Sequence, residues 1–210
     1  MKRYPIPAKE IRTEIKVKNS LFISSVAPAF STDQARKYIS HIKSEYFDAS
    51  HNVPAFLIGH GDSIINHCSD DGEPSGTAGR PVLSVLHGSG FGDIVIVVTR
   101  YFGGIKLGTG GLGRAYSSAA KSALAILPKA IRVPTYTIMI ASPYNRFDVI
   151  RNLIKHHKGI IAAQDFEVEV TITATLDVLD YQNFQSALQE ATNGKIEAVI
   201  TKSSEEIISI

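Results

Sequence analysis

An apolar segment between two glycine-rich segments is the feature that most constrains the fold of this chain. Asp93–Thr99 (DIVIVVT) is almost wholly apolar and β-branched, which predicts a central strand covered on both faces. The surrounding stretch Ser69–Tyr116 holds twelve of the sixteen glycines, mostly in the clusters GEPSGTAG and FGGIKLGTGGLG. Glycine adopts positive φ angles at low cost but weakens regular elements, so these clusters predict shaped loops flanking the buried strand.

Composition indicates a globular protein that works in a reducing compartment. The 210 residues are 44% hydrophobic and 20% charged, which is ordinary for a chain with a packed core. The single cysteine, Cys68, excludes an intramolecular disulfide and a cysteine-based zinc cluster. The first residues lack the apolar core of a signal peptide, and no apolar run approaches the ~18 residues of a membrane span. We therefore expect a cytoplasmic protein that does not enter a membrane.

Charge is unevenly distributed along the chain. Residues 1–134 carry 16 Lys and Arg against 10 Asp and Glu, a net charge of +6, whereas residues 135–210 carry 6 against 10, a net charge of −4. The change of sign favours two domains, and it is compatible with an anionic partner for the first of them or with ordinary surface charge.

The residues before and after the first glycine cluster predict a hairpin, helices and further strands. Residues 11–18 alternate apolar and polar side chains as in a half-buried strand, and LFISSVAPAF is the predicted hairpin partner. Ser31 followed by Gln34 predicts a capped helix that runs to Tyr46. Two strands are expected at 53–59 and 63–68, and two helices at 81–88 and 112–127, the second rich in Ala and Ser.

The last third of the chain predicts the order β-α-β-β-α-β, which is the ferredoxin-like arrangement. The strands are expected at 135–141, 159–163, 167–176 and 195–201, and the helices at 144–157 and from the cap Asp177 to Ala191. The segment LPKAIRVP, with two prolines, is the predicted linker. We therefore expect an α+β protein with one domain at 1–133 and a second at 134–210.

The second glycine cluster permits two interpretations. Gly108–Gly113 matches G-x-G-x-x-G, but eight residues separate it from Thr99, and no Asp or Glu occurs between Asp93 and Asp148. Both features argue against a dinucleotide-binding fold, and the chain has no P-loop motif. The glycines precede a predicted helix whose free amides would hold a phosphate beside Lys106 and Arg114. Alternatively, they only allow this helix to pack closely against the sheet.

The acidic turn SDDGEP is equally open to interpretation. Asp70, Asp71 and Glu73 would suit a hard cation or general acid–base chemistry. They would also suit a solvated turn, caps for the helix at Pro81, or ion pairs with Arg80 or Arg100. Cys68 has no convincing base partner, the histidines lack metal-ligand spacing, and no catalytic triad signature is present. We expect no catalytic residues, no metal and no cofactor.

The segments SDDGEPSGTAG-RP and VTRYFGGIKLGTGGLGRAY resemble the two signatures of the IMPACT family, in its bacterial two-domain (YigZ) form. The resemblance covers the full chain. Two smaller motifs depart from the family pattern, with Leu21 where Arg is usual and Val53 where Cys is usual, and the second departure argues against a thiol function there.

This resemblance implies an N-terminal domain similar to ribosomal protein S5 domain 2 and a ferredoxin-like C-terminal domain. The S5 superfamily includes translation factors and phosphate-binding kinases, and GGLGRAYSSAA is similar to the phosphate loop of those kinases. Eukaryotic members regulate translation by binding a protein that activates the amino-acid-starvation kinase. Because they lack the C-terminal domain, that partner does not transfer to this chain.

From these features we expect a non-enzymatic binding protein linked to translation, with RNA, the ribosome or a translation-associated protein as partner. The expected contacts to RNA or phosphate are Arg80, Arg100, Tyr101, Lys106, Gly108, Thr109, Gly110, Gly111 and Arg114. The alternative is a phosphate- or nucleotide-binding enzyme that uses Gly108–Gly113, with Asp70, Asp71 and Glu73 as metal ligands. A protein-docking surface formed by the same loops is a third possibility.

Overall fold

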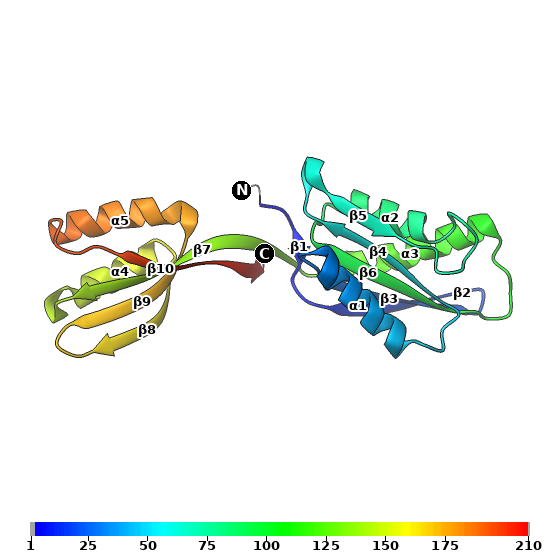
Figure 1. Cartoon of the computed structure of the whole chain (residues 1–210), viewed down its shortest axis with the longest axis horizontal. Helices are drawn as coiled ribbons and strands as arrows, with labels where there is room; N and C mark the ends of the chain where they lie inside the picture. The colour runs from blue at the N-terminus through cyan, green and yellow to red at the C-terminus, as the bar shows by residue number, and fades with distance from the viewer. Residues whose placement is uncertain (1–2, 210) are drawn as a thin grey trace. The chain divides into compact units, whose positions relative to one another are not determined.

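The computed structural model describes residues 3–209 and divides the chain into two compact units, Met1–Ile131 with Ile208–Ile210 and Arg132–Ile207. Each unit contains helices and a largely antiparallel sheet, as expected for an α+β protein (Figure 1). The elements of the first unit are β1 (Ile6–Pro7), β2 (Ile11–Val17), β3 (Ser20–Pro28), α1 (Thr32–Glu45), β4 (His51–Ile58), η1 (Gly61–Ser63), β5 (Ile65–Cys68), α2 (Gly79–Gly88), β6 (Ile94–Tyr101) and α3 (Thr109–Ile126).

The sheet of the first unit has the order β2-β3-β6-β4-β5, with all neighbours antiparallel. The strand predicted from DIVIVVT is β6, and it lies at the centre of the sheet with every residue from Ile94 to Arg100 buried. The predicted β2–β3 hairpin is also confirmed, and its turn uses positive φ angles at Lys18 and Asn19. Central placement explains why β6 needs apolar side chains on both faces.

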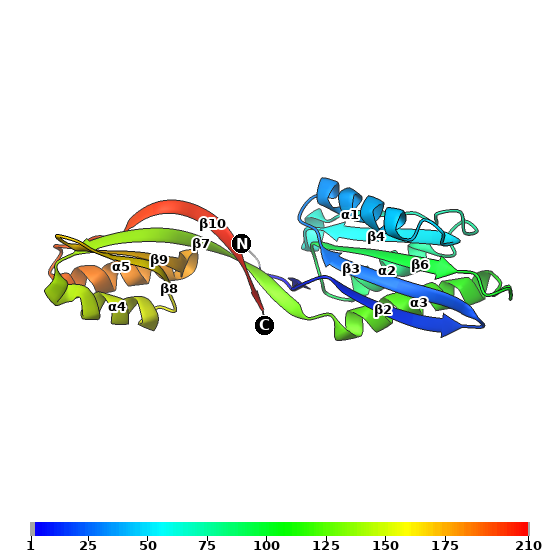
Figure 2. The ribbon, with the colours of Figure 1, turned by 90° about the horizontal axis from the view of Figure 1, so that it is seen from below.

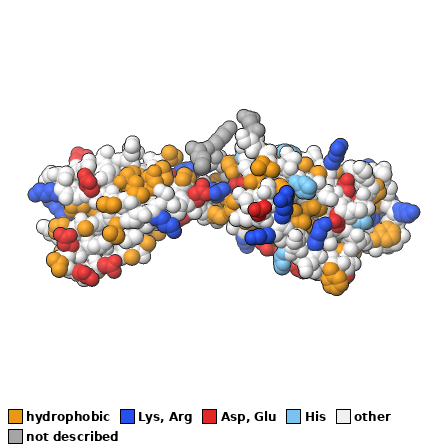
Figure 3. Space-filling view, in the orientation of Figure 1, with side chains coloured by type: hydrophobic (Ala, Val, Ile, Leu, Met, Phe, Trp, Pro, Cys, Tyr) orange, Lys and Arg blue, Asp and Glu red, His pale blue; other side chains and the backbone are white. Residues whose placement is uncertain are grey.

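Helices cover both faces of this sheet (Figure 2). On one face, Val95 and Phe56 pack with Ala35 of α1. On the other face, Ile96 packs with residues of α2 and α3, and the alanines of α3 allow that helix to lie close to the strands. The viewed face in Figure 3 shows Lys and Arg side chains gathered over α1, whose bases are Arg36, Lys37 and Lys43.

Two helix starts follow the expected capping rules. The Ser31 hydroxyl accepts a hydrogen bond from the Gln34 amide at 3.2 Å, and the Gln34 side chain accepts one from the amide of Phe30 at 2.8 Å. Asp177 accepts a hydrogen bond from the amide of Leu179 at 3.0 Å at the start of α5 (Val178–Thr192). These caps fix where each helix begins.

The elements of the second unit follow the predicted order β-α-β-β-α-β. Its elements are β7 (Lys129–Ser142), η2 (Tyr144–Arg146), α4 (Phe147–His156), β8 (Ile160–Phe166), β9 (Val170–Asp177), α5 and β10 (Val199–Ser209). The strands are arranged β10-β7-β9-β8. Its core is formed by alternate residues of β7 and β9, such as Ile138 and Ile172, packed against α4 and α5 residues such as Ile150 and Phe184.

The structure corrects several predicted boundaries. The predicted linker LPKAIRVP contains the division between the two units, at Ile131 and Arg132, but most of it lies in β7, whose first residues pair with β1 and whose residues from Thr135 pair with β9. Strand pairing satisfies the main chain there, so its prolines do not interrupt the extended conformation. The turn predicted at Gln164-Asp165 lies at residues 167–169, and the last strand begins at Val199 rather than Lys195. Helix α3 begins at Thr109, three residues before the predicted start, so Gly110, Gly111 and Gly113 are helical.

Candidate functional site

The two glycine-rich segments meet at a buried ion pair. Arg100, near the end of β6, donates from Nη1 to Glu73 Oε1 at 2.6 Å, and only 5% of Arg100 and 7% of Glu73 are exposed. Arg100 also donates from Nη2 to the Ser20 hydroxyl at 3.4 Å. The pair therefore joins the acidic turn to the central strand from inside the unit.

Aromatic and histidine side chains complete the surroundings of this pair. Tyr116, fully buried on α3, donates its hydroxyl to Glu73 Oε1 at 2.8 Å. The guanidinium of Arg100 lies between the rings of Phe22 and Phe102, 5.5 and 5.4 Å from their centroids, which suits cation–π attraction. Burial, together with the bond to Glu73, raises the pKa of Tyr116, so its hydroxyl stays protonated and keeps donating. One carboxylate oxygen thus binds side chains from both β6 and α3.

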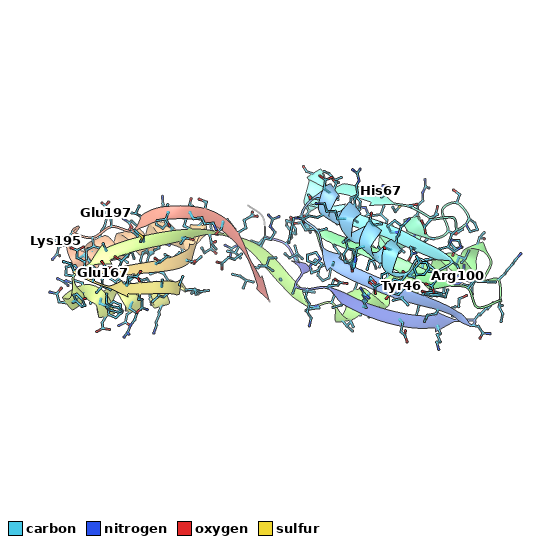
Figure 4. All side chains as sticks on the ribbon, turned by 60° about the horizontal axis from the view of Figure 1, so that its bottom comes forward. Tyr46, His67, Arg100, Glu167, Lys195 and Glu197 are labelled. Atoms are coloured by element: carbon cyan, nitrogen blue, oxygen red, sulfur yellow. The ribbon has the colours of Figure 1, made fainter. Side chains whose placement is uncertain are left out.

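His51, at the start of β4, is a further titratable group beside this cluster. Its Nδ1 lies 2.8 Å from the carbonyl oxygen of Asp71, and its Nε2 lies 3.8 Å from Glu73 Oε1. Since the carbonyl only accepts, Nδ1 carries a proton and fixes the orientation of the ring. Figure 4 shows Arg100 near the same end of the sheet as Tyr46, where α1 ends.

Asp70 caps α2 from outside the helix. One of its oxygens accepts from the amides of Ala78 and Gly79 at 3.0 and 2.8 Å, and the other accepts from Gly76 at 2.8 Å. Partial burial opposes ionisation, but the three amide bonds and Arg80 outweigh it and lower the pKa of Asp70. Capping is therefore the role, among the predicted alternatives, that this carboxylate fulfils.

Asp71 and Glu73 point to other partners. Asp71 accepts from the Asn52 amide at 2.6 Å and forms an ion pair with Lys43. The three acids therefore diverge, and among residues 3–209 no three His, Cys, Asp or Glu side chains form a group suited to a metal ion. The hypothesis that Asp70, Asp71 and Glu73 ligate one metal is not supported by this geometry. Nearby Cys68 is half-buried. Burial raises the pKa of its thiol, and the negative charge of Asp70 raises it further.

Gly103 and Gly108 shape the loop between β6 and α3. A Cβ atom on Gly103 would stand 2.1 Å from the carbonyl carbon of Asn19, so only glycine fits against the β2–β3 turn. Gly108 has φ +71° and is the residue before α3, a backbone conformation that favours glycine. Close packing is therefore the reason for Gly103, whereas Gly108 sets the direction in which the helix leaves the loop.

The first turn of α3 presents unpaired main-chain amides. The first helical hydrogen bond runs from the Leu112 amide to the Gly108 carbonyl at 2.9 Å, and no side chain of residues 3–209 caps the helix. The amides of Thr109, Gly110 and Gly111 are thus available, and the first turn contains no acid. An 18-residue helix with a bare N-terminus attracts anions through its dipole.

Gly110 has no packing reason to lack a side chain. A Cβ atom there would meet only Arg114 Nη1, at an ordinary contact distance of 3.6 Å, and its φ angle is not positive. Glycine within a helix costs about 1 kcal/mol relative to alanine. Gly110 therefore favours the interpretation that something approaches this main chain closely, rather than the interpretation of close helix–sheet packing.

A cavity of about 440 Å³ lies beside this helix start. Arg100 and Glu73 line it from the interior, and Arg100 Nε, which is buried, has no hydrogen-bond partner among the described residues. Lys106 and Phe102 line it from the loop, and both are exposed. The remaining lining is largely apolar and comes from Pro74, Leu107, Gly108, Thr109 and Leu112.

The predicted contact residues thus fall into three groups. Lys106, Gly108 and Thr109 line the cavity together with Arg100, and Gly110, Gly111 and Arg114 continue along the first turns of α3. Arg80 is exposed at the start of α2, and its neighbour Pro81 lies 3.7 Å from the place of a Cβ on Gly113. Tyr101 forms the third group by itself, because it does not line the cavity. Its hydroxyl donates to Asp48 at 2.7 Å, and this hydrogen bond raises the pKa of Tyr101 to about 12.

Sequence reasoning missed four residues of the cluster, namely Phe22, His51, Phe102 and Tyr116. They come from β3, β4, the β6–α3 loop and α3, so no local spacing connects them. Val53 is fully buried in the core. No helix among residues 3–209 has the length and apolar character needed to cross a membrane.

Comparison with known proteins gives matches over both units. Residues 18–124 match the model of the Impact N-terminal domain, and residues 140–195 match that of a domain of unknown function, DUF1949. An IMPACT family member of Haemophilus influenzae is 34% identical over 197 residues, which are 93% of this chain and 96% of that protein. IMPACT family member YigZ of Escherichia coli is 33% identical over 198 residues, covering 94% of this chain and 97% of its own.

One solved structure is similar over nearly the whole chain. The crystal structure of a hypothetical protein shares 32% sequence identity and superposes with a TM-score of 0.64, covering 96% of this chain and 98% of that one. The two-domain architecture is therefore common to this chain and to a protein seen by crystallography.

The first prediction concerns the buried pair. Replacing Glu73 with Ala leaves the Arg100 guanidinium buried without a counter-charge, so we expect the free energy of unfolding of the first unit to fall by about 3 kcal/mol. Glu45→Ala, which breaks an exposed pair with Arg12, is the matched control and has a much smaller effect. Urea unfolding of both variants measures the difference, and equal losses would contradict the structural role of Glu73.

The second prediction concerns pH. Folding lowers the pKa of Asp70, so the ionised cap stabilises the folded first unit. This stabilisation is fully present at pH values above the unfolded-state pKa of about 3.9, and it is lost as the pH falls through the folded-state pKa. Asp70→Asn removes this titration, so its free energy of unfolding, though lower at pH 7, declines less steeply in acid. Urea unfolding from neutral to acid pH tests this, and parallel curves for the two proteins would refute it.

Proposed function

The chain belongs to the IMPACT family, and we propose that it is a non-enzymatic binding protein of translation whose N-terminal unit binds RNA, on the ribosome or apart from it. The site is the cavity at the start of α3, and its ligand groups are phosphates. The observation that carries this proposal is the bare N-terminus of α3, where three amides have no partner among the residues that the structure describes and Gly110 leaves the main chain accessible.

The charges around this helix start favour an anion. Lys106 and Arg114 are exposed, and no acid occurs in the first turn of α3. Positive side chains beside the positive end of a helix dipole repel it, and a bound phosphate would relieve this repulsion. The nearby acids Asp70, Asp71 and Glu73 are engaged by amides, Lys43 and Arg100 respectively, so their charges are already compensated.

Each predicted contact has its own part in this proposal. Lys106, Arg114 and Arg80 supply cations for phosphates, while Gly108–Gly111 supply the amides and the room to approach them. Arg100 lines the interior side of the cavity, and its charge is already paired with Glu73. Only its Nε, which has no partner among the described residues, is left to donate to a ligand. Tyr101 holds the loop through Asp48 rather than contacting RNA.

Phe102 favours RNA over a free phosphate as the ligand. Its ring is 49% exposed at the cavity and lies over the Arg100 guanidinium. An exposed aromatic ring beside phosphate-binding groups suits stacking with an unpaired base, which is the usual mode of single-strand recognition.

The enzyme alternative receives less support. It requires Asp70, Asp71 and Glu73 to hold a metal, but the three carboxylates diverge to separate partners. The phosphate-binding half of that alternative uses the same helix start as the RNA proposal. Screening nucleotides with Mg²⁺ for a saturable rise in melting temperature separates the two, because a specific nucleotide would stabilise the folded state only if it has a site.

The link to translation rests on the family resemblance. We also propose the ferredoxin-like fold for the second unit, supported by the order of its elements and by the strand order β10-β7-β9-β8. The S5 domain 2-like fold of the first unit remains a prediction from the resemblance. Cytoplasmic location and a ribosomal or translation-associated partner are parts of the same proposal.

The third prediction tests RNA binding directly. We expect the double variant Lys106→Glu/Arg114→Glu to bind single-stranded RNA at least about tenfold more weakly at low salt, because two phosphate contacts become repulsive. The slope of log K against log salt should become shallower by roughly 1.5 for the two lost contacts. Fluorescence anisotropy with a labelled RNA measures both quantities.

Lys9→Glu/Lys37→Glu is the matched control, because it makes the same change of net charge at exposed positions away from the cavity. If the control loses as much affinity as the test variant, binding follows net charge and the proposed site is wrong. If neither variant changes affinity, the contact residues are elsewhere.

A further inference from the structure

We propose that the N-terminal unit has a second binding site, at the open edge of β5, which takes up an acidic polypeptide segment in extended conformation. The segment would add a strand to the sheet beside β5 and place its acids against the basic side of α1. This site is separate from the cavity at α3 and shares none of its lining residues.

The register of β4 and β5 leaves main-chain groups of β5 without partners. Phe56 lies opposite His67, and the amide of Ser69 donates to the carbonyl of Pro54 at 3.2 Å. Because hydrogen-bonded pairs alternate in an antiparallel ladder, His67 and Ile65 face β4, whereas the N–H and C=O groups of Asn66 and Cys68 point away from it. Among the described residues β5 pairs only with β4, so this edge is open.

A groove of about 580 Å³ runs between this edge and α1. Its floor comes from β4 and β5, including Phe56, whose ring lies 5.5 Å from that of His67. Ile65, 55% exposed, lies on the same side of β5 as His67. Figure 4 shows His67 on β5 on the side where α1 runs. An added strand would therefore find both a hydrogen-bonding edge and an apolar contact.

The charges that line the groove select an acidic occupant. Arg36 and Lys43 of α1 line it, and no Asp or Glu does. Lys43 is paired with Asp71, but for Arg36 no ion-pair partner occurs among the described residues. Carboxylates spaced along an extended segment would meet this positive wall, which gives the site its charge selectivity.

The other edge of the sheet shows how an edge is protected. Strand β2 presents Arg12, Glu14 and Lys16, and charged residues on an edge strand discourage pairing with another chain. The sequence of β5, INHC, contains no charged Asp, Glu, Lys or Arg. Of the two edges, β5 is therefore the one open to strand addition, a common mode of peptide recognition.

Two other occupants fit this groove less well. A second copy of the chain, paired through its own β5, would offer a strand without Asp or Glu to the basic side of α1. RNA has no peptide groups to match those of Asn66 and Cys68, so it would leave the open edge of β5 unpaired. A polypeptide uses both the edge and the charge.

The fourth prediction uses a defined probe, a fluorescein-labelled peptide of four Glu-Val repeats, with four Lys-Val repeats as its charge-reversed control. We expect the acidic peptide to bind the full chain at least about tenfold more tightly than the basic one in anisotropy titrations. Amide hydrogen exchange should slow at Asn66 and Cys68 when the acidic peptide is bound, and remain unchanged along β2.

Variants separate this site from the rest of the positive surface. Arg36→Glu should weaken the acidic peptide about tenfold, whereas Lys37→Glu, the adjacent exposed base outside the groove, should have little effect. Asn66→Pro removes one outward N–H without breaking the β4–β5 ladder, so it should weaken the peptide while the melting temperature stays close to that of the wild type.

Equal affinities of wild type and Arg36→Glu would overturn the proposal, as would peptide binding without slower exchange at Asn66 and Cys68. If sedimentation shows a dimer that forms through β5, the occupant of this edge is a second copy of the chain, and the proposal of an acidic polypeptide is wrong. Preferential binding of the basic peptide would show that the charge argument is wrong.

Discussion

The ion pair between Glu73 and Arg100 is the interaction on which the arrangement of the first unit depends. One carboxylate oxygen joins the acidic turn to β6, and through Tyr116 it also joins α3. A charge pair that is more than nine-tenths buried is tolerated only when both members are satisfied, because either alone would carry a large desolvation cost. The two glycine-rich segments must therefore fold together, and the cavity beside α3 is the space left between them.

The same ion pair separates the residues of the two glycine-rich segments into an inward-facing group and an exposed group. Asp70, Asp71 and Glu73 are turned inward or toward amides, and Arg100 with them, so the chemistry suggested by their proximity in sequence does not form. Lys106, Arg114 and the amides of the first turn of α3 remain outside, where an anionic ligand can reach them. These exposed cations and amides are the groups on which the proposed RNA contact rests.

Local patterns were sufficient for much of the fold. Periodicity and caps predicted the β2–β3 hairpin, the start of α1 at Ser31, the central strand β6 and the cap at Asp177, because each depends on neighbours a few residues away. The sequence predicted a linker at LPKAIRVP but not that most of this segment is a strand, because its strand partners, β1 and β9, are distant in sequence. His51 and Tyr116 were missed for the same reason, since they join Glu73 only through tertiary contacts.

Sedimentation of the tagged protein with ribosomal particles, through sucrose gradients at low and high salt and with or without RNase, tests the central claim most directly. An RNA-binding surface built on exposed cations and helix amides predicts co-migration with the particles at low salt, and its loss at high salt or after RNase. A protein that stays at the top of the gradient at low salt would contradict binding on the ribosome, and one that co-migrates regardless of salt and RNase would contradict an electrostatic RNA-binding surface.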